Sequence, residues 1–532
     1  MEGEGAGAAS FAWGDRAPLS LFVAGLALVV AFDLGTPVPF NDEWLYRWVV
    51  QRFVDGHGFH LFPGQAPSAL VQLGLGVLVS FRGTDPQVLR LSAVPFIAAT
   101  GFALYKLSRD LGADRFFSGV AAAAPLAIPV YAAAVTGYMT EPYYLALLML
   151  AALVMCRWLT TGRGAPMMLT LSLMAALQRQ HAAALPPALT IGLLIASRRR
   201  TLPTAAWAWL GAVWLAVGAA VVLPPVMGLQ TIQMQDYYRS LVRPALAPGV
   251  ASLLYVPGMT GLACLAFAGG LVWREQVSAS AWWRTARLPA LIGLFVVLVA
   301  KTYVLPGNYL TMAGLNPITV AGNKPSLYAW VLPPLNGLCL LCFAALVVRP
   351  TRLWPIMRDP RAVFLVALGM LGLLPLLSGD VLDRYYLPVV LPLLPVVAAL
   401  TRGARWPRAS RLWAVAALLA GLVMFVVGEG DYQSWQVARA AAERMAVQRV
   451  PAAEVFSGFE PYGVDVVLPE LDRTGRLPPY AGLRAATLEA PPHPRMLLVI
   501  TGPYDPRPGA SYRSLAPGKI VLVCVDRIGC PG

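Results

Sequence analysis

Charged side chains stand at the ends of apolar runs in several places along this sequence of 532 residues. After the first apolar run, Asp42 and Glu43 open the segment PFNDEWLYRWVVQRFVDGHGFHLFPG. A carboxylate at such a boundary can take a proton from an acceptor hydroxyl or amine, which makes this acidic pair a candidate general base. The alternative is a helix start, in which Asn41 is the cap and the two acids favour the dipole of the first turn.

Three further positions combine charge with apolar surroundings. Glu141 opens one apolar run, Arg179 interrupts another within LQRQH, and Arg384 with Tyr385 opens a third. Ionisable groups at membrane depth are costly and often functional, and a guanidinium suits a lipid phosphate. Each position also has a simpler interpretation. Glu141 is then a helix start, Arg179 snorkels at a helix end, and Arg384 pairs with its neighbour Asp383.

A metal site is the other chemistry that the sequence raises. His57 and His60 lie with Asp55 in the Gly-rich stretch DGHGFH. Two imidazoles and a carboxylate can bind a metal ion, although zinc usually needs a third or fourth well-placed ligand. The sequence therefore predicts no definite cofactor and leaves a divalent metal ion open.

The composition limits the class of protein that presents these residues. Hydrophobic residues make up 58% of the chain and charged residues 13%, about half of the ~25% usual in soluble domains. The net charge of +14 is thinly spread, with no block of like charges that would follow a nucleic-acid backbone. These features exclude a soluble enzyme, a disordered chain and a nucleic-acid binder. They predict a mainly α, polytopic protein embedded in membrane lipids.

Apolar runs close to the ~20 residues that cross a bilayer predict about thirteen transmembrane helices. The runs lie at about 17–35, 91–107, 117–135, 143–160, 166–180, 182–197, 204–223, 251–272, 288–305, 329–348, 361–377, 386–400 and 411–428. Alternate linkers are short and basic, and the positive-inside rule places these in the cytoplasm together with the N-terminus. The remaining linkers are longer, aromatic and mixed in charge, so we expect the functional face outside.

Two regions lie outside this helical domain of residues 1–428. In the first exterior loop, at about 36–90, Trp44 and Trp48 recur at helical spacing on one side of the stretch after Asn41. This pattern predicts an interfacial helix whose aromatic residues contact the headgroup region. Residues 429–532 begin helically and then show two strand-like runs at 496–500 and 520–525, which predict a small extracytoplasmic α/β domain. Cys524 and Cys530 in this domain could form a short disulfide.

The chain resembles the GT-C superfamily of polyprenyl-phosphate-dependent glycosyltransferases, close to the bacterial protein-mannosyltransferase and aminoarabinose-transferase group. The resemblance rests on features that follow one another along nearly the whole chain. They are the acidic pair Asp42-Glu43, RLSAVPFIAATGFALYKLSRDLG, Thr140-Glu141, LPGNYLTMAGLNP, DRYYLPVVLPLLP, and a tail with DYQSWQVAR and SGFEPYG. Each motif alone is unspecific, and the resemblance to the superfamily rests on the order of the motifs together with the topology.

The resemblance implies roles for individual residues. Asp42 would be the catalytic base, with Glu43 as its neighbour or substitute. Glu141 would help to hold a metal ion or the donor head group. The late Arg-Tyr pair of the family corresponds to Arg384 and Tyr385.

One departure from the family concerns phosphate binding. Aminoarabinose-type relatives carry a Lys-Pro-Pro segment in the first loop, whereas this chain reads FPGQAPSAL, with Gln65 and no lysine. Phosphate contacts must then come from other cations. The candidates are Arg384, Arg179, Lys301 and Lys324.

The expected protein is therefore an inverting glycosyltransferase of the bacterial cytoplasmic membrane, with its site and C-terminal domain outside. It would move a sugar from a polyprenyl-phosphate donor to an extracytoplasmic lipid, protein or polysaccharide. A ligase or polymerase of lipid-linked oligosaccharides is the nearest alternative. A non-enzymatic lipid or sugar transporter is the other, although transporters usually show repeated halves and ionisable residues near the membrane midplane.

Overall fold

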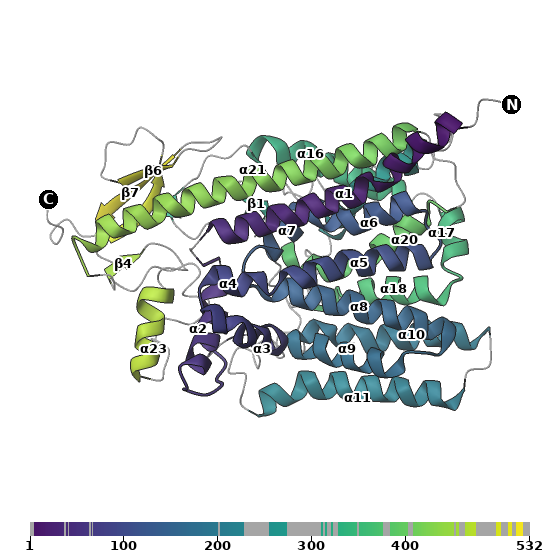
Figure 1. Cartoon of the computed structure of the whole chain (residues 1–532), viewed down its shortest axis with the longest axis horizontal. Coiled ribbons are helices and arrows are strands. Elements are labelled where there is room, and N and C mark those ends of the chain that lie inside the picture. Colours follow the sequence, from purple (N-terminus) through teal and green to yellow (C-terminus); the bar gives the residue numbers. More distant parts are fainter. Residues whose placement is uncertain are drawn as a thin grey trace.

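The structure is a computed structural model of the chain. It describes residues 5–36, 39–40, 42–62, 65, 67–199, 203–227, 255–273, 310–311, 314–315, 321–322, 328–347, 350–375, 383–402, 408–451, 454–456, 463–474, 496–501, 509–512 and 518–524. This part is mainly helical, as the composition predicts, and most of its long helices lie side by side along one direction (Figure 1).

The bundle follows the apolar runs of the sequence. Its helices are α1 (Gly5–Gly35), α5 (Val94–Asp110), α6 (Arg115–Ala127), α7 (Pro129–Val135), α8 (Thr140–Thr161), α9 (Ala165–Gln178), α10 (Leu185–Ser197), α11 (Thr204–Val226), α14 (Val256–Trp273), α16 (Tyr328–Val347), α18 (Pro360–Leu371), α19 (Leu387–Val390), α20 (Leu393–Ala399) and α21 (Arg408–Val447). Twelve of the predicted runs therefore coincide with described helices. The run at 288–305 lies outside the described residues.

Five described segments are long and apolar enough to cross a membrane: Arg16–Gly35, Pro86–Asp110, Thr140–Thr161, Thr204–Pro224 and Arg408–Val447. A sixth span is possible if α6 and α7, which meet at a bend of 67°, cross together. The break falls at the Pro125 to Pro129 stretch, because proline cannot donate the backbone hydrogen bond that would continue the helix. The described residues thus indicate a membrane protein with at least five candidate spans.

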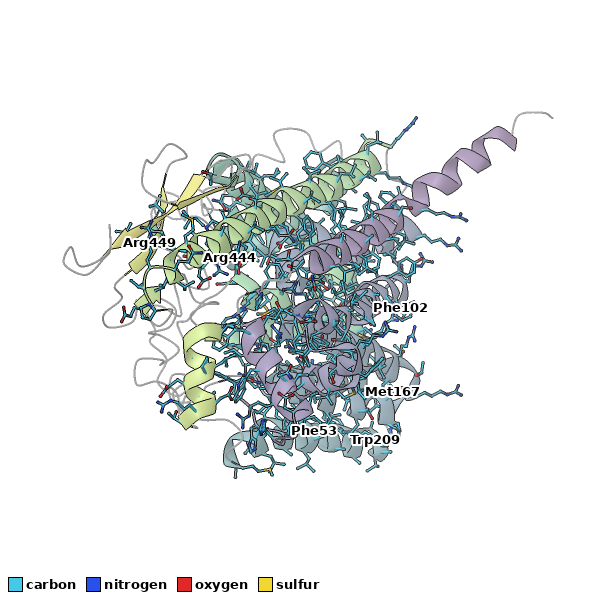
Figure 2. The ribbon with its side chains drawn as sticks, turned by 60° about the vertical axis from the view of Figure 1, so that its left-hand side comes forward. Phe53, Phe102, Met167, Trp209, Arg444 and Arg449 are labelled. Atoms are coloured by element: carbon cyan, nitrogen blue, oxygen red, sulfur yellow. The ribbon has the colours of Figure 1, made fainter. Side chains whose placement is uncertain are left out.

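Apolar side chains also cover the outside of this bundle. Phe102 of α5 and Met167 of α9 are each 55% exposed and point outward (Figure 2). Leu215 and Val423 are exposed on α11 and α21. Exposed apolar side chains of this kind, spread over several helices, suit a hydrocarbon solvent rather than water.

The two ends of the bundle differ in chemistry. At one end, here called the basic end, Arg157 pairs with Asp110 at 3.2 Å and Arg402 packs against Gly112. The short helix α17 (Pro350–Ile356) lies there too (Figure 1). The opposite end, here called the site end, carries α2 (Glu43–Val54), α4 (Pro86–Leu91), η4 (Asp383–Tyr386) and the C-terminal strands. Among the described residues, the basic residues Arg157 and Arg402 thus lie at the end opposite to α2 and η4.

The first loop is helical, with α2, α3 (Leu70–Val79), η1 (Ser80–Arg82) and α4. The predicted lipid contact of its tryptophans is wrong. Trp44 and Trp48 are buried, and both rings meet Phe62 edge to face. Val467 and Leu471 of the C-terminal region pack against the same cluster. The aromatic side of α2 therefore faces protein, and a partner more than 400 residues away in sequence supplies the cover.

The C-terminal region contains the predicted strands. β5 (Met496–Thr501) and β7 (Gly518–Cys524) pair antiparallel, with Leu498 opposite Leu522. β6 (Gly509–Tyr512) extends the sheet beside β7, and β4 (Val455–Phe456) and β3 (Ala321–Gly322) pair with β5 in parallel. β3 lies between the apolar runs predicted at 288–305 and 329–348, as does the short hairpin of β1 (Leu310–Thr311) and β2 (Gly314–Leu315). Cys530 lies outside the described residues.

α21 joins the bundle to this sheet without a break. It runs through 40 residues, across the predicted domain boundary at 428–429. Arg444 near the end of α21 and Arg449 just beyond it lie beside the strands (Figure 2). One continuous helix therefore connects the bundle to the sheet. The short helix α23 (Leu468–Thr474) contacts α2 through the hydrogen bond from Trp48 to Asp472.

Candidate functional site

Two clusters of charged side chains lie at the site end, and neighbouring residues of the chain belong to different clusters. We call Asp33, Glu43 and Arg90 the Arg90 cluster. We call Asp42, Glu141, Arg179 and Arg384 the Arg384 cluster. The boundary between the two clusters falls between Asp42 and Glu43, at the first turn of α2.

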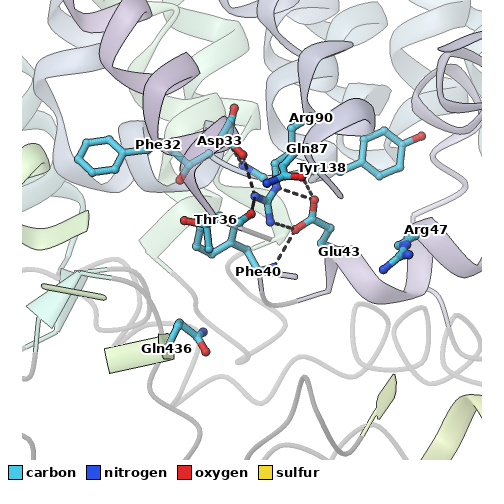
Figure 3. A network of polar contacts seen from close by, with 12 residues as sticks. Phe32, Asp33, Thr36, Phe40, Glu43, Arg47, Gln87, Arg90, Tyr138 and Gln436 are labelled. Atoms are coloured by element: carbon cyan, nitrogen blue, oxygen red, sulfur yellow. Dashed lines mark hydrogen bonds and ion pairs between the residues drawn. The ribbon is translucent and has the colours of Figure 1, made fainter. Parts of the chain in front are cut away.

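The Arg90 cluster is closed to solvent. The Arg90 guanidinium donates to both Glu43 carboxylate oxygens, from Nε to Oε1 at 2.8 Å and from Nη2 to Oε2 at 2.6 Å (Figure 3). Its Nη1 donates to the backbone carbonyls of Asp33 and Thr36 at the end of α1. Both side chains of the pair are 0% exposed. This arginine therefore ties the end of the first span to the start of α2.

Backbone N–H groups supply further hydrogen bonds to the two acids of this cluster. Phe40 N–H donates to Glu43 Oε2 at 2.8 Å, and Tyr138 N–H donates to Glu43 Oε1 at 3.0 Å. Gly137 N–H donates to Asp33 Oδ1 at 2.8 Å. Gly137 has φ of +96° and sits against Phe40, so a side chain at this position would be strained. The turn before α8 is thereby fixed against the first loop.

A second set of contacts holds α9 against the same turn. The Gln178 side-chain oxygen accepts from Gln72 N–H at 3.0 Å, and the Gln72 amide donates to the Tyr138 carbonyl at 2.9 Å. Both glutamines are buried. Because Gln178 ends α9, these bonds place the next residue, Arg179, beside the start of α8.

The Arg384 cluster is a chain of alternating charges. Arg179 Nη1 lies 2.7 Å from Glu141 Oε1, and Arg384 Nε lies 3.5 Å from the same oxygen. Arg384 Nη2 also lies 3.6 Å from Asp42 Oδ2. Four separate segments meet here, namely the start of α2, the start of α8, the end of α9 and η4. The two acids balance the two cations.

Asp42 differs from the other members because it is partly open. Its side chain is 20% exposed, whereas those of Glu141, Arg179 and Arg384 are at most 9% exposed. Asp42 occupies the N-cap position of α2, yet its side chain makes no capping hydrogen bond. Burial raises the pKa of the Asp42 carboxyl, Arg384 opposes this rise, and Glu141 adds to it. The arrangement gives a carboxylate that is reachable and more basic than usual.

Aromatic side chains surround this cluster. Tyr385 lies beside both guanidinium groups, 5.5 Å from Arg179 and 5.8 Å from Arg384, and meets the His181 ring edge to face. Tyr46 follows Asp42 by one helical turn and is buried. Burial, with the carboxylates of Asp42 and Glu141, raises the pKa of the Tyr46 phenol well above its usual value. The phenol therefore stays protonated and remains a hydrogen-bond donor.

The structure brings together most of the residues that the sequence predicts for the site: Asp42, Glu141, Arg179, Arg384 and Tyr385. Arg179 does not snorkel, because it is buried and paired. The side chain of Arg384 reaches Asp42 and Glu141, while the Asp383 carboxylate accepts from the Arg384 backbone N–H at 2.7 Å. Glu141 lies in the first turn of α8, as the helix-start interpretation predicts, and it also belongs to the Arg384 cluster.

The remaining candidates separate from this group. Glu43 has both oxygens occupied within the Arg90 cluster, which favours a positioning role over the predicted catalytic one. Lys301 and Lys324 lie outside the described residues. Within the described part, no group of three or more His, Cys, Asp or Glu side chains could hold a metal ion, so His57, His60 and Glu141 form no such site there.

Sequence reasoning assigned no role to four residues in or beside the two clusters, namely Asp33, Arg90, Tyr46 and His181. Arg90 lies within a motif quoted for the family resemblance, and its signal is a single cation at the start of a long apolar helix. Tyr46 lies four residues after Asp42, the spacing that places two side chains on one helix face. His181 stood next to Arg179 in the LQRQH segment.

The site end therefore defines a class in coarse terms, a helical membrane protein with a partly open carboxylate beside a buried arginine pair. No protein-family model matches this chain, and no curated protein matches it. The assignment of a function must then rest on the residues themselves.

Proposed function

We propose that this protein is an integral membrane glycosyltransferase that moves a sugar from a polyprenyl-phosphate donor to an extracytoplasmic acceptor. The observation that carries the proposal is the Arg384 cluster, where a partly exposed Asp42 lies 3.6 Å from Arg384 at one end of an apolar bundle. A base next to a phosphate-binding cation, at the edge of a lipid-facing surface, is what transfer from a lipid phosphate requires.

Each group has a chemical task in this reaction. Asp42 takes the proton of the acceptor hydroxyl or amine as that atom attacks the anomeric carbon. The bond from this carbon to the phosphate oxygen breaks, and the electron pair leaves with the polyprenyl phosphate. Arg384 stabilises the added negative charge of the leaving group. Attack opposite to the phosphate inverts the configuration of the sugar.

Glu141 and Arg179 position these two groups. Arg179 holds Glu141 at 2.7 Å, and Glu141 in turn lies against Arg384 at 3.5 Å. Tyr385 contributes a partly exposed ring beside both guanidinium groups, and rings of this kind pack on the apolar faces of sugars. Lys301 and Lys324 stay candidates for further phosphate contacts.

The proposal extends to the architecture and the orientation. It places about thirteen spans in a GT-C-type arrangement in the bacterial cytoplasmic membrane, with the basic end in the cytoplasm by the positive-inside rule. The site end, the C-terminal sheet and α23 then face the exterior. The lipid tail of the donor would lie between spans, with its phosphate at the outer surface.

The test is mass spectrometry of envelope glycans and lipid-linked sugars from cells that produce wild-type protein or Asp42→Asn at equal levels. Asp55→Asn is the matched control, because Asp55 is exposed in the same loop and bonds only to Gln51 in the described structure. The proposal predicts that Asp42→Asn loses one glycan and accumulates its polyprenyl-phosphate sugar. The control should match wild type.

Other outcomes separate the alternatives. Accumulation of a lipid-linked oligosaccharide, rather than a single sugar, would point to a ligase or polymerase. Unchanged glycans in a full deletion would contradict the enzyme and favour the transporter. A deletion phenotype that Asp42→Asn does not share would remove Asp42 from catalysis.

A further inference from the structure

Arg384 occupies a shared position within the site. Its Nη2 faces Asp42 Oδ2 at 3.6 Å and its Nε faces Glu141 Oε1 at 3.5 Å. The contact with Asp42 is longer than a direct hydrogen bond, whereas Arg179 holds Glu141 at 2.7 Å. The contact of Arg384 with Asp42 is therefore looser than the contact of Arg179 with Glu141, and Glu141 keeps Arg179 whatever Arg384 does.

The net charge of the Arg384 cluster changes when a donor phosphate binds beside Arg384. With two acids and two arginines the cluster is neutral, and an incoming phosphodiester adds one negative charge. Of the two arginines, Arg384 lies nearer to the opening, since it contacts the partly exposed Asp42. An anion that arrives beside Asp42 must then compete with the Asp42 carboxylate for Arg384.

We propose that Arg384 is handed from Asp42 to the donor phosphate, so that donor binding releases Asp42 to act as a base and precedes productive binding of the acceptor. This inference rests on the proposed function and adds the order of events to it. Before the donor binds, Arg384 limits the rise in the pKa of Asp42 that burial causes. After the donor binds, Asp42 faces Glu141 without its cation and takes up a proton more readily.

The affinity for the donor phosphate should depend on pH, because donor binding changes the pKa of Asp42. Among the described residues, the charged and titratable groups that act on Asp42 are Arg384, Arg179, Glu141 and Tyr46. Loss of Arg384 to the anion raises the pKa of Asp42 further, because the cation that lowers it is withdrawn. Donor binding then takes up protons, so the affinity for a phosphodiester increases as pH falls through this range. A phosphodiester itself does not titrate there, which keeps the readout specific.

The experiment measures equilibrium binding of a short-chain polyprenyl methyl phosphate to the full chain in lipid nanodiscs. Asp42→Asn removes the competitor for Arg384, so we expect its affinity for the probe to increase about fivefold or more, in the range typical of couplings between two sites. Arg384→Gln should weaken binding about ten- to hundredfold. Asp55→Asn, which also removes one negative charge from the first loop, should leave the dissociation constant unchanged.

The pH series adds an independent readout. Wild-type affinity should increase toward low pH, and this dependence should vanish in Asp42→Asn. Equal or weaker binding by Asp42→Asn, or a pH dependence that persists in it through a group such as His181, would overturn the handover. Failure of the folded wild-type protein to bind the probe at all would instead overturn the proposed donor class, on which the handover depends.

Discussion

Asp42 and Glu43 are adjacent acids, yet the structure places them in opposite environments. Glu43 is fully buried, accepts from Nε and Nη2 of Arg90, and accepts two backbone hydrogen bonds. Asp42 is 20% exposed and has Arg384 at 3.6 Å. A carboxylate whose lone pairs are all engaged cannot easily accept a further proton, whereas a partly open one can. Two acids that are adjacent in sequence can therefore have different roles, one structural and one chemical.

Replacing each acid with its amide tests the different roles of Asp42 and Glu43. Asp42→Asn removes the base while keeping the size of the side chain, so we expect transfer to fall about 10²- to 10⁴-fold. The folded protein should be as stable as wild type, because the Arg90 cluster is untouched. The measurement is the rate of sugar transfer per folded molecule. A rate within a few-fold of wild type would contradict the role of Asp42.

Glu43→Gln tests the structural side of the comparison. It leaves the Arg90 charge buried without its partner, and we expect this to cost about 3–5 kcal/mol in the free energy of unfolding. Thermal melting in detergent or nanodiscs measures the loss. The double variant Glu43→Gln with Arg90→Met should recover part of this stability, because it removes the uncompensated charge. Full stability of the single variant would contradict the clamp.

The pH dependence of the transfer rate reports the pKa of Asp42 as the base. Burial raises the pKa of Asp42, and the base must be deprotonated, so activity should fall as pH decreases through a value above the usual ~3.9 of aspartate. Below that value the rate should drop about tenfold per pH unit, as expected for one essential base. Arg384→Gln should shift this acidic limb to higher pH, because Arg384 lowers the pKa of Asp42. A limb at or below the usual value would contradict the assignment.

The smallest expected effect concerns the contact between α2 and α23. Asp472 accepts from Arg52 Nη1 at 2.6 Å and from Trp48 Nε1 at 3.2 Å, and its side chain is half exposed. Asp472→Ala should therefore cost only about 0.2–1 kcal/mol of stability. Melting temperature measures this effect, with Glu470→Ala as the control on the same helix. A loss as large as that of Glu43→Gln would show that α23 clamps the first loop.

Local patterns predicted the parts of the fold that depend on nearby residues. Apolar runs gave the helices, and MLLVI and IVLVCV gave the two central strands. Arg179 could be singled out because a cation within apolar sequence must find a partner. The sequence thus supplied the members of the Arg384 cluster, although not their contacts.

Long-range partners account for what the sequence did not predict. Glu43 looked like a second catalytic acid because Arg90 lies 47 residues away, and nothing local indicates a bidentate pair. Trp44 looked lipid-facing because two members of its buried cluster, Val467 and Leu471, come from the opposite end of the chain. The predicted boundary at 428–429 marked the end of an apolar run, and α21 continues through it as one helix.

Sugar transfer should depend on Asp42 and not on Glu43. The most direct measurement compares Asp42→Asn with Glu43→Gln by the amount of glycan formed per folded molecule, in cells grown at a temperature where both variants fold. Asp42→Asn should be folded and inactive, while the folded fraction of Glu43→Gln should be active. A folded, inactive Glu43→Gln beside an active Asp42→Asn would contradict this dependence on Asp42.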